Sequence, residues 1–475
     1  MAEKVTPDIC VIGGGAAGLS LAAGAAAFGA SIVLVEKGTM GGECLNTGCV
    51  PSKALLAAAR RARLVRESAR FGVTASLAEI DFQKVHGHVH DIIAAIAPND
   101  SAERFTALGV RVIKGAAQFV NRKTVAIGDD FEIRARRFVI ATGSSPAIPA
   151  ISGLESTRYF TNETIFDLTV LPEHLVVIGA GPVGLELAQA FRRLGSAVTV
   201  LEAGAPLAKD DPECADVVLS ALRREGVVIR SGVTVVKASG NGDGITLTVS
   251  EKGTAETIKG THLLVAAGRA PRVDGLGLDA ARIKHGSAGI KVNKKLRTSN
   301  RRVYAIGDVI GPPQFTHAGN YHAGLVIRSA LFRLKVRVDN DSIPWVTYTD
   351  PELAQTGLTE ARARQRGINI RVLRWPYHES DRAQIERDTI GHIKVITDRK
   401  GGILGATIVG AHAGELITAW TLAISQQMNI RAFAGIVVPY PTLSEMGKRA
   451  AIDFFTPSLT SSWVRRIMTW LRLLG

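Results

Sequence analysis

The chain has 475 residues, and single hydrophobic cores stop growing near ~250–300 residues, so the length predicts three or four domains. Hydrophobic residues make up 46% and charged residues 21%, with 49 glycines, which fits a folded α/β protein and excludes a disordered chain. Four cysteines are too few for a secreted disulfide framework, which favours a cytoplasmic protein in which any disulfide is catalytic. The net charge of +14 suits anionic partners, but few aromatic residues interleave with the basic ones, which argues against nucleic-acid binding.

A phosphate-binding turn is predicted where a strand over 8–12 meets an alanine-rich helix over 19–28. A second strand over 32–35 follows and ends at an acid, Glu36. The turn contains three glycines, Gly13, Gly15 and Gly18. Such glycines allow a tight turn, a close approach of the backbone to a pyrophosphate, and close packing of helix on strand. They also interrupt the apolar run, which argues against a signal peptide or a membrane span.

Between this unit and the next predicted helix, Cys44 and Cys49 lie five positions apart with glycine and asparagine between them. A turn could bring the two sulfur atoms into disulfide contact. If Cys49 begins a helix, the helix N-terminus would lower the pKa of its thiol. The spacing alone equally allows two unrelated buried cysteines. A zinc site is not favoured, because no second pair with ligand spacing follows.

The design of the first unit recurs later in the chain. A strand over 174–178 precedes a helix over 185–194 and a strand over 197–201 that ends at Glu202. The glycines of this copy are Gly179, Gly181 and Gly184. In both copies the acid lies 23 positions after the first glycine: Glu36 follows Gly13, and Glu202 follows Gly179. Two matching copies predict two dinucleotide-binding units.

Apolar strands ending in a small residue and a glycine, at 138–143 and 263–268, would each close one nucleotide unit. A later strand over 303–308 comes too late for the second unit, so the first domain is interrupted by the second. The expected segments are 1–150 and 271–341 for the first dinucleotide domain, 151–270 for the second, 342–460 for an α+β interface domain, and 461–475 for a tail.

The tail is predicted to form an amphipathic helix over 463–474. Its apolar side chains share one face, and Arg465, Arg466 and Arg472 lie opposite. Such a helix could lie on a membrane surface or pack against its own protein.

The stretch GGECLNTGCVPSK at 41–53 resembles the redox-active disulfide of the pyridine nucleotide-disulfide oxidoreductases, which include lipoamide dehydrogenase, glutathione reductase and mercuric reductase. The resemblance extends through both glycine motifs, ATG at 141–143, AAGRAP at 266–271 and AIGD at 305–308. It implies two Rossmann-like domains for FAD and NAD, a C-terminal α+β dimerisation domain and a homodimer. The cofactor-binding residues that it implies are Gly13, Gly15, Gly18, Glu36, Lys53, Thr142, Gly143, Gly179, Gly181, Gly184, Glu202, Gly268, Arg269, Gly307 and Asp308.

The resemblance also assigns roles at the flavin. Glu36 is expected on the adenosine ribose and Asp308 on the ribityl or phosphate side. Lys53 is expected near the reactive nitrogen of the flavin, with Glu186 as its acidic partner. His317 and His322 resemble the helix under the flavin and are expected to be structural.

The implied reaction joins the two nucleotide units to the cysteine pair. Glu202 would accept hydrogen bonds from a free ribose 2′-hydroxyl and repel a 2′-phosphate, which favours NADH over NADPH. Electrons would pass from NADH through FAD to the Cys44–Cys49 disulfide. Cys49 would contact the flavin as a thiolate, and Cys44 would exchange with the substrate.

The chain departs from the family near its C-terminus. Disulfide-reducing relatives carry a histidine and, five residues later, a glutamate, whereas this chain has Tyr440 followed by Glu445. A phenol with a pKa near ~10 is a poorer base at neutral pH than an imidazole near ~6.5. A tyrosine here resembles mercuric reductase, although no cysteine follows Cys214 to form that enzyme's C-terminal pair. Tyr440 could also be a packed residue at a dimer seam.

The expected function is that of a cytoplasmic, homodimeric, NADH-dependent reductase of a disulfide or a thiol-bound metal substrate, with no resident metal. A peripheral membrane NADH:quinone reductase is an alternative suggested by the net charge and the tail. A redox-sensing or assembly flavoprotein with vestigial activity is another, suggested by Tyr440 alone.

Overall fold

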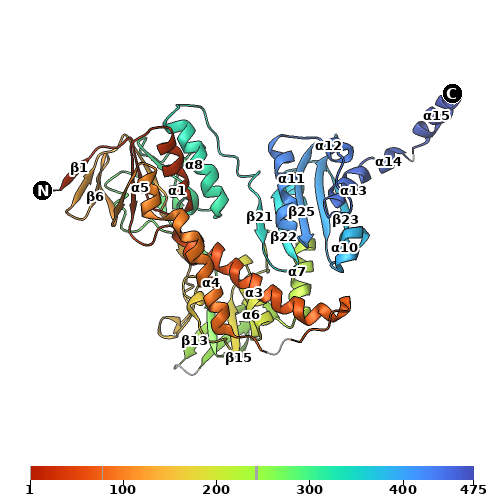
Figure 1. Ribbon diagram of the computed structural model, residues 1–475, viewed down its shortest axis with the longest axis horizontal. Helices are drawn as coiled ribbons and strands as arrows, with labels where there is room; N and C mark the ends of the chain where they lie inside the picture. The colour runs from red at the N-terminus through yellow and green to blue at the C-terminus, as the bar shows by residue number, and fades with distance from the viewer. Residues whose placement is uncertain (1, 77–78, 241–243, 460, 475) are drawn as a thin grey trace. The chain divides into compact units, whose positions relative to one another are not determined.

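A computed structural model of the chain describes residues 2–76, 79–240, 244–459 and 461–474 (Figure 1). The chain divides into two compact units and passes between them several times, once inside helix α6 (Pro182–Leu194). The first unit contains Met1–Gly179, Ala190–Ala203 and Val233–Asp339, and the second contains Ala180–Gln189, Gly204–Gly232 and Asn340–Gly475. The finer division into segments that the sequence suggests stays a prediction.

A parallel sheet forms the centre of the first unit, in the strand order β20-β8-β2-β3-β4. Its strands are β2 (Ile9–Ile12), β3 (Ile32–Glu36), β4 (Val110–Lys114), β8 (Arg137–Ile140) and β20 (Val303–Ala305). The long helices of this unit are α1 (Ala16–Ala27), α3 (Cys49–Glu67), α4 (Phe82–Ile96) and α8 (Thr316–Ala330). Because β20 pairs with β8, this late strand belongs to the same sheet as the first glycine motif.

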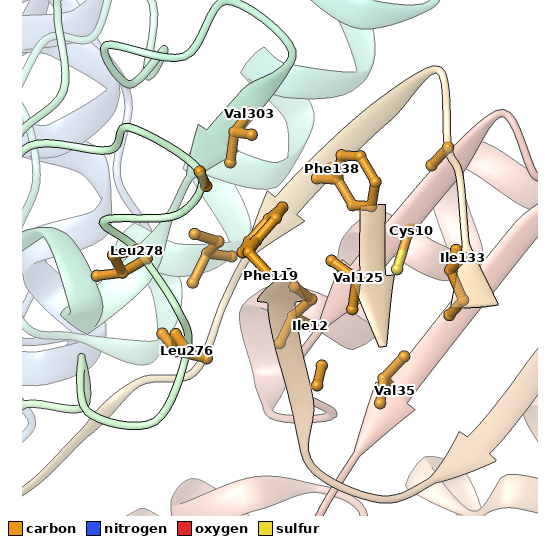
Figure 2. Close-up of a cluster of buried hydrophobic side chains, with 14 of the residues drawn as sticks. Cys10, Ile12, Val35, Phe119, Val125, Ile133, Phe138, Leu276, Leu278 and Val303 are labelled. Atoms are coloured by element: carbon orange, nitrogen blue, oxygen red, sulfur yellow. The ribbon is translucent and has the colours of Figure 1, made fainter. Parts of the chain in front are cut away.

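Side chains of β2 alternate between the two faces of this sheet, as expected for a strand buried on both sides. Ile9 and Val11 lie in the hydrophobic cluster that includes residues of α1 and α8. Cys10 and Ile12 lie in the opposite cluster, together with Phe138 (Figure 2). Burial raises the pKa of the Cys10 thiol to about 12, so Cys10 is an unreactive core residue.

The second glycine motif follows another set of parallel strands. Strand β10 (His174–Ile178) lies between β11 (Ala197–Glu202) and β16 (His262–Val265). Two further sheets of the first unit contain β1 (Glu3–Val5), β5 (Ala117–Asn121), β6 (Thr124–Ile127) and β7 (Phe131–Ile133), and β13 (Val233–Gly240), β14 (Ile245–Glu251) and β15 (Thr254–Gly260). The predicted α/β class is confirmed.

The second unit contains an antiparallel sheet in the strand order β21-β22-β25-β24-β23. Its strands are β21 (Trp345–Thr347), β22 (Glu352–Gly357), β23 (Ile370–Pro376), β24 (His392–Asp398) and β25 (Ile403–Gly410). The helices of this unit include α7 (Pro212–Arg224), α9 (Glu360–Gln365), α11 (Ala413–Ser425), α12 (Arg431–Gly435), α13 (Glu445–Asp453), α14 (Thr456–Leu459) and α15 (Ser462–Leu471). No helix among the described residues is both long and apolar enough to cross a bilayer.

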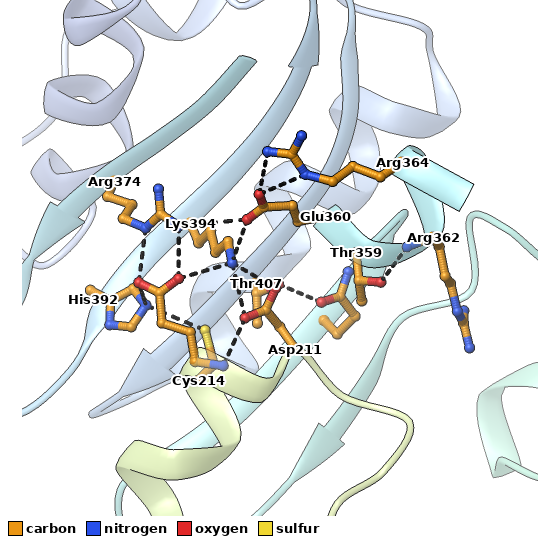
Figure 3. Close-up of polar contacts among 12 residues, drawn as sticks. Asp211, Cys214, Thr359, Glu360, Arg362, Arg364, Arg374, His392, Lys394 and Thr407 are labelled. Atoms are coloured by element: carbon orange, nitrogen blue, oxygen red, sulfur yellow. Dashed lines mark hydrogen bonds and ion pairs between the residues drawn. The ribbon is translucent and has the colours of Figure 1, made fainter. Parts of the chain in front are cut away.

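A buried lysine links α7 and α9 to the antiparallel sheet within the second unit (Figure 3). The Lys394 side chain is 4% exposed, and its Nζ lies 2.8 Å from Asp211 Oδ2 and 2.9 Å from one oxygen each of Glu213 and Glu360. Arg374 donates two hydrogen bonds of 2.8 Å to Glu213. Because the Asp211 side chain is only 2% exposed, Lys394 supplies the compensating charge for a buried carboxylate.

Replacing Lys394 with methionine is expected to lower the free energy of unfolding by about 3–5 kcal/mol, since it leaves Asp211 buried and uncompensated. Urea unfolding of the purified protein measures this. The matched control is Lys400→Met, at an exposed residue of the turn after β24, which should change stability by less than about 0.5 kcal/mol. Equal stability of the two variants would contradict the role assigned to Lys394.

The same cluster predicts a loss of stability in acid. Hydrogen bonds from Arg374 lower the pKa of Glu213 from 4.5 to about 2, and those from Lys394 add to the effect. A carboxylate with a depressed folded pKa stabilises the fold fully above its unfolded value of 4.5 and loses that contribution as the pH falls toward 2.

Candidate redox and nucleotide site

The two cysteines of the predicted redox pair meet where the short helix α2 (Gly42–Asn46) gives way to α3. Helix α3 begins at Cys49, and its N-cap Gly48 provides no side-chain cap, so the helix dipole favours a thiolate at Cys49. Both residues are thiols in this structure, Cys44 half-buried and Cys49 exposed. The Cys49 Sγ lies 3.5 Å from the Thr316 hydroxyl.

The two thiols interact directly. A hydrogen bond with Cys49, burial and the negative charge of Cys49 together raise the pKa of Cys44 far above its usual range. Two thiolates this close would repel each other, so the reduced pair ionises once. The raised pKa of Cys44 and the helix N-terminus at Cys49 both place that charge on Cys49.

The first glycine motif forms a tight turn between β2 and α1. Gly13 has a φ of +114°, and a Cβ at this position would collide with the carbonyl oxygen of Ala141. A Cβ on Gly18 would collide with the carbonyl oxygen of Gly13, so helix and turn pack in direct backbone contact. The N-cap of α1, Gly15, makes no side-chain cap, which leaves the first-turn N–H groups available to an anion.

Two acids flank this turn. Glu36, at the end of β3, accepts hydrogen bonds from the backbone N–H groups of Gly14, at 2.5 Å, and Gly38, at 2.6 Å. Asp308 follows β20 in the short helix η5 (Gly307–Ile310) and accepts a 2.6 Å hydrogen bond from the Ser144 hydroxyl. Burial raises the pKa of Asp308 above its usual value.

These residues fit FAD. The turn has N–H groups for a pyrophosphate. Glu36 follows the glycines at the spacing expected of an acid that accepts hydrogen bonds from a ribose hydroxyl. His322, on α8, accepts a 3.3 Å hydrogen bond at Nδ1 from the N–H of Gly307. Its Nε2 is buried without a hydrogen-bond partner among the described residues, so a polar group of a bound ligand could satisfy it. Burial lowers the pKa of His322 to about 4, which keeps the ring neutral.

The ends of β8 and β16 supply further predicted residues. Thr142 donates a 2.8 Å hydrogen bond to the carbonyl oxygen of Arg272, and Gly143 accepts one of 3.0 Å from the N–H of the same residue. Gly268 has a φ of +124°, and its carbonyl oxygen accepts a 2.9 Å hydrogen bond from Ala147. Together with the pairing of β9 (Ser144–Pro146) and β17 (Arg269–Pro271), these contacts join the segment after β8 to the segment after β16. Both segments lie in the first compact unit.

The second glycine motif repeats the first turn locally. Gly179 has a φ of +107°, and a Cβ there would collide with the carbonyl oxygen of Ala266. Glu202 ends β11, as Glu36 ends β3. Gly181 and Gly184 belong to the second unit, so the nicotinamide site that combines them with Gly179 and Glu202 stays a prediction.

A charged network beside Cys44 was not expected from the sequence. Arg269 donates to both carboxylate oxygens of Glu43, with 2.5 Å between Nη1 and Oε1, and its Nε donates to the Ser144 hydroxyl at 2.8 Å. Asn162 donates to Glu43 at 2.7 Å and to the carbonyl oxygen of Thr47 at 3.1 Å. Arg269 was expected only as a cofactor residue. Glu43 gives no sequence signal, because its partner lies 226 positions away.

Lys53 and Glu186, predicted to pair at the flavin, lie in different compact units. The Lys53 Nζ contacts the hydroxyl of Ser52 at 3.4 Å in the first unit, and Glu186 accepts a 2.9 Å hydrogen bond from the N–H of Tyr348 in the second. The pairing of Lys53 with Glu186 therefore stays a prediction.

Tyr440 and Glu445 both lie in the second unit. The Tyr440 hydroxyl donates a 2.7 Å hydrogen bond to Asp381, and this bond, with the charges of Asp381 and Glu445, raises the pKa of the phenol. Glu445 begins α13, with its carboxylate 4.0 Å from Arg449. The contact with Asp381 is a further feature that the sequence did not indicate.

Comparison with known proteins identifies the family. Residues 7–323 match the family model described as pyridine nucleotide-disulphide oxidoreductase, and residues 343–451 match the dimerisation domain of that family. The chain is 35% identical over 450 residues to a mercuric reductase from Lysinibacillus sphaericus, covering 94% of this chain and 82% of that protein. It is 34% identical to a dihydrolipoyl dehydrogenase from Geobacillus stearothermophilus, covering 94% and 96%.

A solved structure agrees with these matches. The HOCl-induced flavoprotein disulfide reductase RclA from Escherichia coli superposes with a TM-score of 0.83 at 26% identity, covering 94% of this chain and 99% of that one. A glycine turn suited to FAD, a cysteine pair at a helix N-terminus and a dimerisation domain are thus found together in one chain. The chain belongs to the pyridine nucleotide-disulphide oxidoreductases, FAD-dependent enzymes that use a pyridine nucleotide.

Proposed function

We propose that this enzyme is a cytoplasmic homodimer that uses NADH to reduce a disulfide or a thiol-bound metal ion through Cys44 and Cys49. The observation that supports it best is the direct hydrogen bond between these two thiols at the N-terminus of α3. The same unit carries the glycine turn, Glu36 and Asp308 that fit FAD. FAD, when bound, supplies two-electron transfer between the nicotinamide and the cysteine pair.

The two cysteines have different tasks in this proposal. The helix N-terminus stabilises a thiolate at Cys49, which suits the sulfur that faces the flavin. The raised pKa of Cys44 keeps this thiol protonated while Cys49 carries the charge. Cys44 exchanges with the substrate once its proton is removed, because the thiolate is the nucleophile in such exchange.

Glu202 supports NADH as the electron donor. It ends β11 at the position where an acid accepts hydrogen bonds from a ribose 2′-hydroxyl. The residues that follow it, Ala203, Gly204 and Ala205, contain no cation that could bind a 2′-phosphate. The carboxylate would repel such a phosphate.

Tyr440 bears on the choice of substrate. A phenol whose pKa is raised by Asp381 is a weak base for the Cys44 thiol at neutral pH. Its oxygen can instead act as a ligand for a metal ion held by thiolates, and relatives of this chain include mercuric reductases. We propose that a partner subunit contributes Tyr440 and Glu445 to the cysteine pair, since both lie within the matched dimerisation domain.

Anaerobic titration tests the proposal. One equivalent of NADH should yield two thiols that react with Ellman's reagent and a long-wavelength thiolate-to-flavin absorbance, whereas NADPH at equal concentration should react more slowly. In Cys44→Ser, turnover with disulfide or thiol-bound metal acceptors should fall by more than about 100-fold. Cys214→Ala, at a buried cysteine outside the pair, is the control and should keep its activity.

Two outcomes would count against this proposal. Quinone turnover that survives Cys44→Ser would favour a quinone reductase. An absence of NADH turnover with every disulfide, metal and quinone acceptor would favour a sensing or assembly role.

The Glu43 network predicts an effect on Cys44 itself. Glu43→Gln removes the ion pair between α2 and Arg269. Fewer contacts then hold α2 in place, chiefly those of Asn162. In the enzyme reduced with dithiothreitol, the half-buried Cys44 should react with iodoacetamide several-fold faster, because α2 opens more often. The exposed Glu103→Gln is the control and should leave the rate unchanged. Identical alkylation rates in both variants and wild type would remove Glu43 from this role.

Tyr440→His is expected to raise turnover with a dithiol or disulfide substrate at pH 7 by at least about 10-fold, because an imidazole transfers protons near neutral pH. Steady-state kinetics across pH measure this. Tyr440→Phe removes the hydrogen bond to Asp381 without adding a base, and it should show no such gain. An unchanged rate in Tyr440→His would show that proton transfer at this position does not limit turnover.

A further inference from the structure

The C-terminal helix α15 carries large apolar side chains in exposed positions. Ser461 caps the helix by accepting a 3.3 Å hydrogen bond from the N–H of Val464, and no residue of Ser462–Leu471 is buried. Trp463 is 69% exposed, Trp470 61% and Leu471 44%. Apolar surface of this kind, gathered on one short helix, marks an interaction site.

The exposed residues are sorted by helical position. At ~100° per residue, one face of the helix carries the apolar residues Trp463, Ile467, Trp470, Leu471 and Leu474. The opposite face carries Arg465 and Arg472, and Arg466 lies at the border of the apolar face beside Trp470. Tryptophan beside an apolar face, with arginines opposite, is the composition of helices that lie in a lipid interface.

The charge of this segment has a single sign. The described part of the chain has no acidic residue after Asp453, so the three arginines are not neutralised within 461–474. The matched dimerisation domain ends at residue 451, so the helix lies outside the part that the family shares. A second copy of this chain carries the same net charge of +14, so it attracts these arginines less than an anionic surface does. An anionic surface complements this charge and a second copy does not.

We infer that residues 461–474 dock the enzyme on an anionic lipid surface, with the apolar face of α15 inserted among the headgroups. A helix of 10 residues is about 15 Å long, half of the ~30 Å hydrocarbon core, so it lies in the interface and does not span it. Each arginine near the surface adds attraction to anionic lipid. This inference goes beyond the proposed reductase activity and does not depend on it.

The test uses the full-length FAD-loaded enzyme and two sets of vesicles, phosphatidylcholine alone and phosphatidylcholine with phosphatidylglycerol. Wild type should sediment with the anionic vesicles, less so as salt rises, and tryptophan fluorescence should shift to shorter wavelength. Replacing Arg465, Arg466 and Arg472 with glutamine should weaken binding by at least about 10-fold. Trp463→Ser with Trp470→Ser should also weaken it, since the apolar face is then reduced.

A control triple variant replaces three exposed cations outside the tail, Lys294, Lys295 and Arg301, with glutamine. It changes the net charge equally and should bind as wild type does. Equal binding of wild type to neutral and anionic vesicles, or equal losses in both triple variants, would overturn the inference. Loss of the dimer in the tail variants by light scattering would also overturn it, because the helix would then serve a second copy. NADH oxidation with a soluble acceptor measures the reductase activity independently of lipid binding. Failure of the lipid-binding inference can therefore be told apart from failure of the proposed reductase function.

Discussion

The carboxyl edge of the parallel sheet is the constraint on which the nucleotide site depends. The register aligns Ile12 of β2 and Ala305 of β20 with Ile140 of β8, so all three strands end at the same level. The residues that follow them, the Gly13 turn, the 141–143 segment and Asp308, therefore meet at one edge although they come from distant parts of the sequence. This is the place where open α/β sheets bind their ligands.

The redox pair is connected to this edge by side chains. Glu43 precedes Cys44, and its carboxylate is held by Arg269, whose Nε also lies 3.5 Å from Asp308. Burial lowers the pKa of Arg269, but the hydrogen bonds and charge of Glu43 outweigh this and raise it, so the guanidinium stays charged. The position of Cys44 and the surroundings of Asp308 thus share one arginine.

The second unit uses charge in two different ways. Lys394 is enclosed and pairs with three carboxylates, which fixes α7 and α9 on the sheet. Tyr440 is 69% exposed, and its hydroxyl contacts only Asp381 among the bonds described for it. The first arrangement stabilises the domain, whereas the second holds an exposed phenol against a single carboxylate.

The sequence by itself determined the two glycine turns, the strands around them and the position of the cysteine pair, because glycine spacing and alternating burial are local properties of the chain. It predicted α3 only conditionally, and the structure begins that helix at Cys49. The contacts of Glu43 with Arg269 and of Lys394 with Asp211 were decided only by the tertiary structure, since their partners lie 226 and 183 positions apart. A charged side chain has the same local signature whether it is solvated or buried against an ion partner, and only the folded chain brings that partner within reach.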